Sequence, residues 1–303
     1  MKKRMIQCTL CVLAILLCGC QKETGGHYYL CSDLFKCCEP KLTASQTEYN
    51  FYTYLVTPEP ELEVEVVEVK GQNVDQCKVE FQGIDDGTTA DDFQYKGYYN
   101  RMLSFRVTTD AQEISIESIT LKINGEVAEY PYASPIHLTR MKEQDDIDDN
   151  EESPVYGTKI PLTTTVRDFL NGRITWDFVA EEDVWIESIA LDDFFRLKNV
   201  TVTIPEGDRV DRLNLEADEP VLVPGGCEFW VEFDAEYADG SQWSHLDYIR
   251  TPFTLRYTAA DSGKEYEFVR NECGTYPYAE SDEDLVKAYI DHALSRMEQG
   301  TGN

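Results

Sequence analysis

Three stretches of this chain share one pattern that decides its fold: LEVEVVEV at residues 62–69, ISIESITL at 114–121 and VWIESIAL at 184–191. In each stretch apolar residues occupy alternate positions up to a glutamate, and the alternation then shifts by one residue. Alternation with a period of two is typical of a β-strand with one buried face. A shift of one residue is what a β-bulge produces. The three stretches therefore predict bulged strands in a β-sheet protein.

A second strand-like segment precedes each of these stretches, at residues 52–56 (YTYLV), 103–107 (LSFRV) and 174–178 (ITWDF). Because the connections are short and polar, we expect each pair of segments to form a hairpin. Many strands without long helices between them are typical of immunoglobulin-like sandwiches. We therefore predict an all-β fold with two immunoglobulin-like β-sandwich modules in tandem, at residues 48–140 and 155–278.

Two segments interrupt or end the β pattern. Residues 141–154 carry a run of acidic side chains, and because like charges repel each other we interpret this run as an extended linker between the modules. Residues 281–299 place apolar side chains at helical spacing, which predicts a C-terminal amphipathic helix. We expect this helix to pack on the second module; the alternative is a docking helix for a partner.

The start of the chain has a basic segment at residues 2–4, a short apolar core at 10–17 and the sequence LCGC at 17–20. This arrangement resembles the signal peptide and lipobox of bacterial lipoproteins. The resemblance implies that residues 1–19 are removed, that Cys20 carries a diacylglycerol, and that the mature chain is anchored outside the cytoplasm in a bacterial cell membrane or outer membrane. The apolar core is too short to span a bilayer. An ordinary secreted protein and an uncleaved anchor are the alternatives.

Residues 20–47 show no clear period, so we interpret them as a tether that carries cysteines. Outside the cytoplasm, the six cysteines after Cys20 could form three disulfides. They are Cys31, Cys37, Cys38, Cys77, Cys227 and Cys273. Proximity in the chain favours Cys227 with Cys273, and Cys77 with one of the first three. Free thiols are one alternative. A metal site of His27, Cys31, Cys37 and Cys38 is another, although its spacing matches no common zinc pattern.

The chain is strongly acidic, with a formal net charge of −30. Such a charge repels nucleic acid, so we expect no nucleic-acid partner. The sequence contains no P-loop, no dinucleotide-binding glycine motif, no G-x-S-x-G and no H-E-x-x-H. We therefore expect no enzymatic activity and no cofactor.

Two non-catalytic classes of function remain, and both keep the membrane as a partner through the lipid anchor. A binding or scaffold module would hold another envelope protein. A carbohydrate-binding lipoprotein would stack exposed aromatic rings on a glycan. The candidate rings are Tyr95, Tyr98, Tyr99 and Trp243. An envelope hydrolase is a third class, for which no pair of carboxylates stands out.

Overall fold

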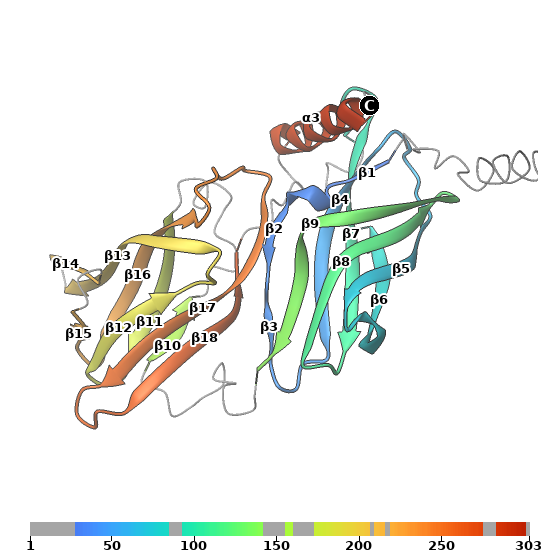
Figure 1. The fold of residues 1–303 in the computed structure, drawn as a ribbon. Helices are drawn as coiled ribbons and strands as arrows, with labels where there is room; N and C mark the ends of the chain where they lie inside the picture. Colours follow the sequence, from blue (N-terminus) through green and yellow to red (C-terminus); the bar gives the residue numbers. More distant parts are fainter. Residues whose placement is uncertain are drawn as a thin grey trace, which may run out of the picture.

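A computed structural model describes most of the chain after the predicted signal peptide. The described residues are 28–84, 93–141, 155–159, 173–206, 209–215, 219–274 and 283–300. Cys20, His27 and nearly all of the expected acidic linker lie outside them. Two groups of strands lie side by side, and the helix at residues 283–300 covers one end of the first group (Figure 1). The prediction of an all-β fold with a C-terminal helix is confirmed.

The first sandwich consists of two antiparallel sheets with the strand order of an immunoglobulin domain. One sheet has the order β1-β4-β7-β6, and the other contains β5, β8 and β9 in that order. Their bounds are Tyr29–Leu30 (β1), Glu48–Thr57 (β4), Val64–Gln72 (β5), Cys77–Ile84 (β6), Tyr99–Thr109 (β7), Glu113–Ile123 (β8) and Glu126–Arg140 (β9). Named in chain order, these sheets are A-B-E-D and C-F-G.

The second sandwich repeats this order. One sheet runs β10-β11-β16-β13-β14, and β12 pairs with β17, which pairs with β18, so that β10-β11-β16-β13 corresponds to A-B-E-D and β12-β17-β18 to C-F-G. The bounds are Val155–Lys159 (β10), Arg173–Ala180 (β11), Val184–Ala190 (β12), Phe195–Glu206 (β13), Arg209–Asn214 (β14), Val221–Val223 (β15), Glu228–Tyr237 (β16), Tyr248–Ala259 (β17) and Glu265–Cys273 (β18). The prediction of two immunoglobulin-like sandwiches is therefore confirmed.

One short strand belongs to both sandwiches. After the single turn η1 (Ser32–Leu34), β2 (Phe35–Cys38) pairs in parallel with β9 of the first sandwich and with β17 of the second. The strand β3 (Lys41–Leu42) continues along β9. A nine-stranded sheet thus passes through both sandwiches, with β2 between β9 and β17 (Figure 1). This corrects the expected tether, because residues 28–42 are part of the folded body.

The three expected hairpins are wrong. β4 and β5, β7 and β8, and β11 and β12 lie in opposite sheets and do not pair with each other. A strand that crosses to the other sheet buries alternate side chains just as a hairpin partner does, so the alternation cannot distinguish the two arrangements.

The predicted bulges are present in all three strands. The register shifts at Glu117 where β8 pairs with β9, and at Glu187 where β12 pairs with β17. In β5 the shift falls at Val67 instead, and the side chain of Val67 is 51% exposed. Here the apolar residue that seemed to face the core is the one the bulge turns outward.

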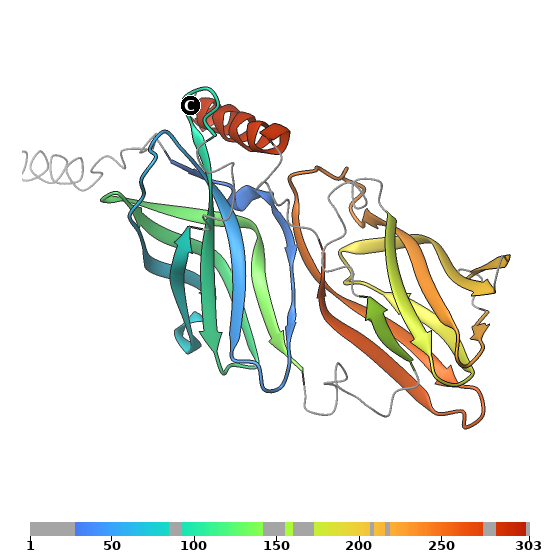
Figure 2. The same ribbon diagram turned by 180° about the vertical axis from the view of Figure 1, so that it is seen from behind.

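The C-terminal helix α3 (Glu283–Gly300) packs on the first sandwich and not, as expected, on the second. Its buried side chains Val286, Tyr289, Ile290 and Ala293 contact one end of that sandwich, and the rings of Tyr289 and Tyr54 lie 4.4 Å apart. Figure 2 shows the helix across this end from behind. The apolar stripe proposed for a partner is therefore already covered. In the described part of the chain, no helix has the length and apolar character needed to cross a membrane.

We predict that Gly274→Ala destabilises the protein by about 2 kcal/mol more than Gly83→Ala, because overpacking typically costs this much. Both glycines have a φ near +150°, but a Cβ on Gly274 would lie 2.0 Å from the carbonyl oxygen of Ile249, whereas a Cβ on Gly83 would meet nothing within 4 Å. Urea unfolding of both variants measures the difference. Equal losses would show that β17 tolerates the added methyl group.

Candidate functional site

The three N-terminal cysteines point into three different apolar clusters. Cys37 lies in the core of the second sandwich, and Cys38 in the core of the first. Cys31 lies in the cluster under α3. The neighbours Cys37 and Cys38 separate because successive side chains of a strand point to opposite faces. This corrects the alternative of a metal site, since these thiols do not face a common point.

Neither predicted disulfide is present. Cys77 carries a free thiol whose Sγ contacts the carbonyl oxygen of Val74 at 3.3 Å, and Cys227 is also free. The side chain of Cys273 lies outside the described part of the structure. Proximity in the chain was therefore misleading, because residues that are near in sequence need not bring their side chains together in a sheet.

A different set of polar side chains meets where the two sandwiches join. Cys37 ends the shared strand together with Cys38, Glu39 follows it, and Asp192 follows β12 of the second sandwich. The Sγ atom of Cys37 and a carboxylate oxygen of each acid all lie within 4.8 Å of one another. Cys37 is 1% exposed, and both acids are half-buried. No spacing rule finds this set, because residues 39 and 192 are far apart in the chain.

Two adjacent residues of β17 hold both acids in place. The amide of Glu39 donates to the carbonyl oxygen of Arg250 at 2.8 Å, and the amide of Asp192 donates to Oγ1 of Thr251 at 3.3 Å. The carboxylate of Asp192 also accepts a bond from the amide of Phe194 at 3.0 Å. The two acids therefore converge because adjacent residues of one strand fix them.

Burial, followed by a hydrogen bond to Asp192 and the negative charge of Asp192, raises the pKa of Glu39 to about 7. Two carboxyl groups this close in a half-buried place resist ionising together. Glu39 therefore keeps its proton at pH values below about 7. Chemically, a thiol beside a carboxyl pair can bind a cation or exchange a proton.

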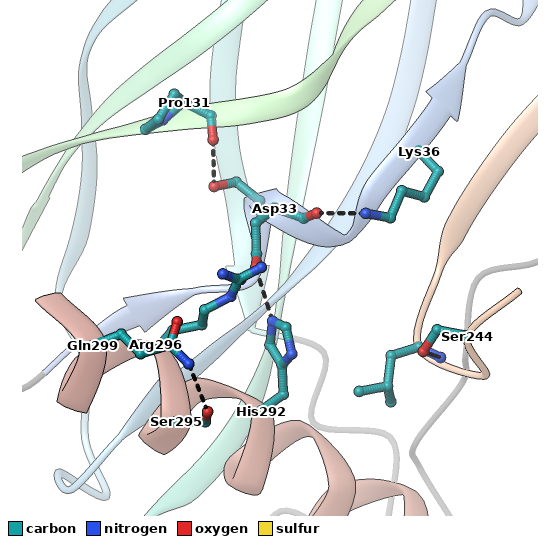
Figure 3. Close-up of polar contacts among 10 residues, drawn as sticks. Asp33, Lys36, Pro131, Ser244, His292, Ser295, Arg296 and Gln299 are labelled. Atoms are coloured by element: carbon teal, nitrogen blue, oxygen red, sulfur yellow. Dashed lines mark hydrogen bonds and ion pairs between the residues drawn. The ribbon is translucent and has the colours of Figure 1, made fainter. Parts of the chain in front are cut away.

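A second polar cluster fixes α3 to the N-terminal segment (Figure 3). Nε2 of His292 lies 2.9 Å from Oδ2 of Asp33, and Nε of Arg296 lies 3.2 Å from the same oxygen. Burial of Asp33 acts to raise its pKa, but the hydrogen bond and charge of His292, the hydrogen bond from Tyr29 and the charge of Arg296 lower it below its usual value. This cluster therefore connects the first folded residues to the last helix.

The four candidate glycan-contacting rings do not form one exposed platform. Trp243 packs against the core of the second sandwich, parallel to Phe195 at 5.7 Å, and its Nε1 donates to the carbonyl oxygen of Ala235 at 2.9 Å. Its ring also lies 4.0 Å from that of Tyr237. The indole ring of Trp243 is therefore engaged in contacts within the second sandwich.

The tyrosines lie elsewhere, near α3. Tyr95 and Tyr98 exchange two backbone hydrogen bonds of 2.9 Å and pack against the cluster under the helix. The guanidinium of Arg101 lies 4.9 Å from the ring centre of Tyr99. Carbohydrate binding by these rings stays a prediction.

The fold and these clusters define a protein of two immunoglobulin-like sandwiches joined through a shared strand. No protein-family model and no curated protein matches the chain. Among solved structures it is similar to the N-terminal periplasmic domain of ScsB from Proteus mirabilis, with 11% identity over 77% of this chain and 91% of that one and a TM-score of 0.20. It is also similar to the YadV chaperone, with 6% identity over 81% of this chain and 99% of that one and a TM-score of 0.20.

A third similar structure is the CupB2 chaperone from Pseudomonas aeruginosa, with 10% identity over 77% of this chain and 96% of that one and a TM-score of 0.17. These structures include a periplasmic domain and two chaperones. Because all three TM-scores are far below 0.5, the likeness carries no argument about function.

We predict that the free energy of unfolding falls as the pH rises from about 5 to about 8, and that Glu39→Gln removes this part of the slope. The folded state holds a proton on Glu39 up to a pKa of about 7, whereas the unfolded state releases it near its ordinary value of 4.5. Urea unfolding at both pH values measures the slope. Glu117→Gln, at an exposed bulge, is the control and should keep it. An identical slope for Glu39→Gln and the natural chain would contradict the raised pKa of Glu39.

We predict that Asp33→Asn weakens hydrogen-exchange protection of α3 by about 1–2 kcal/mol at neutral pH, as expected for hydrogen bonds to a charged group. The pKa of Asp33 is lower in the folded state than in the unfolded state. Its contribution to stability is therefore present at neutral pH, and it is lost as the pH falls from the unfolded-state pKa of 3.8 through the folded-state pKa. The exposed Asp110→Asn is the matched control. Unchanged protection in Asp33→Asn would show that apolar contacts alone hold the helix.

Proposed function

We propose that this chain is a lipid-anchored bacterial envelope protein that acts outside the cytoplasm as a non-catalytic binding or scaffold module. The resemblance of residues 17–20 to a lipobox supports the anchor. Eight peptide steps separate Cys20 from Tyr28, the first described residue. At about 3.5 Å per residue they reach no more than roughly 28 Å. A lipid on Cys20 would therefore keep the folded body close to its membrane.

The observation that carries the scaffold role is the shared strand β2. Domains connected only by a linker move relative to each other unless their interface is large and apolar. Here backbone hydrogen bonds of β2 to β9 and β17 connect the sandwiches, and the rings of Phe35 and Tyr248 stack across that pairing with centres 4.2 Å apart. A rigid pair of sandwiches can present surfaces at a fixed distance and angle, as a scaffold requires.

The two polar clusters also support a structural role. The Asp33 cluster connects η1 to α3, and the Glu39 and Asp192 pair connects the end of β2 to the second sandwich. Both therefore hold elements of the fold together. The acidic surface expected from the net charge of −30 would favour basic or neutral partners.

We predict that Cys20→Ala abolishes fatty-acid labelling and moves the protein out of the detergent phase in a two-phase extraction, because the acylated thiol is removed. Cys18→Ala, two residues away, should leave both readouts unchanged. Amine cross-linking in intact cells of the natural chain and of Cys20→Ala would then compare their neighbours. Equal labelling of both variants would overturn the anchor. Specific turnover of an envelope polymer by the purified protein would overturn the non-catalytic role.

A further inference from the structure

We propose that Cys37, Glu39 and Asp192 form a binding site for a divalent transition-metal ion of the zinc class at the junction of the two sandwiches. The site requires neither the lipid anchor nor a scaffold role. A negative result for this site would therefore leave the proposed function unaffected, and the reverse also holds.

The donor set matches the chemistry of such an ion. A thiolate and two carboxylates are all ligands of Zn²⁺, whereas Ca²⁺ and Mg²⁺ favour oxygen ligands alone. Ligand atoms around a tetrahedral Zn²⁺ lie about 3.5 Å apart. The three donor atoms already lie within 4.8 Å of one another, so roughly 1 Å of side-chain movement closes the site. Three protein ligands leave a fourth position for water or an external group.

Burial and charge both favour an ion at this place. The thiol of Cys37 lies in the core of the second sandwich, and the two acids are half-buried. Without a cation, the carboxylates of Glu39 and Asp192 would repel each other at this short separation. A divalent ion would offset that repulsion and displace the proton of the Cys37 thiol, since metal ligands bind in their deprotonated forms. Binding would therefore release a proton.

The two sides of the site belong to different parts of the fold. Cys37 and Glu39 follow one another at the end of β2, and Asp192 lies in the loop after β12, held by Thr251 of β17. Because the unfolded chain does not keep these residues together, an ion would bind the folded state preferentially and stabilise it. A bound ion would also hold the shared strand against the second sandwich.

The test uses the full chain, stripped of metal with a chelator and kept reduced. Titration with Co²⁺ should give a near-ultraviolet thiolate-to-cobalt absorption band that saturates at one ion per chain, and Zn²⁺ should displace it. Zn²⁺ should also raise the unfolding temperature by several degrees. Asp192→Asn and Glu39→Gln should each weaken Zn²⁺ affinity at least tenfold. Asp193→Asn, an adjacent exposed acid, is the matched control and should bind as the natural chain does.

Cys37→Ser should lose the thiolate band, whereas Cys77→Ser should keep it. If Cys37→Ser fails to fold, the comparison of Asp192→Asn with Asp193→Asn decides, because both changes remove one charge from the same loop. The proposal is overturned if the natural chain shows no saturable band. It is also overturned if Asp192→Asn and Asp193→Asn bind Zn²⁺ equally, or if the band persists in a folded Cys37→Ser.

Discussion

The parallel pairing of β2 with both β9 and β17 is the constraint on which the rest of this structure depends. The two faces of β2 point into different cores. Cys37 lies in the core of the second sandwich, and Cys38 lies in the core of the first. The register shift between Phe35 and Cys37 makes this division possible, because it places Phe35 with Tyr248 in the first core before the strand turns its next side chain to the second. The strand β17 shows the same division, since Tyr248 at its start lies in the first core and the buried apolar side chains from Ile249 to Tyr257 lie in the second.

This sharing places polar chemistry at the junction. A strand that ends between two cores must turn its next residue toward whatever lies at their common edge, and for Glu39 that is Asp192. The Asp33 cluster arises in the same way just before β2, where Asp33 of η1 contacts His292 of α3. In both places an acid from the N-terminal segment meets a group supplied by a distant part of the chain. Partly buried acidic groups of this kind are tolerated only where they are paired with a cationic group, protonated or bound to an ion.

Strand and helix features could be predicted from the sequence where the local pattern of apolar residues matches the pattern of burial. The bulges at Glu117 and Glu187 could be predicted because the slip in alternation is itself the signal, and α3 could be predicted from its helical spacing. Prediction of strand pairing failed where the same alternation fits two arrangements. The alternating apolar residues of β4 and β5 fit a hairpin as well as they fit two strands in opposite sheets of a sandwich. It failed again where the pattern is too short, as in β2. The triad of Cys37, Glu39 and Asp192 depends on pairing between distant strands, which no spacing reveals.

The position of β2 also determines when the protein can complete its fold. This strand lies near the start of the chain, but its partner β17 begins at Tyr248, close to the end. Because a chain is synthesised from its N-terminus, residues 35–38 lack their partner β17 until almost every other strand has been made. Contacts so distant in sequence form slowly, and apolar strand edges that wait for them are prone to aggregate. Folding of this protein would therefore finish with the pairing of β2, its second strand, to β17.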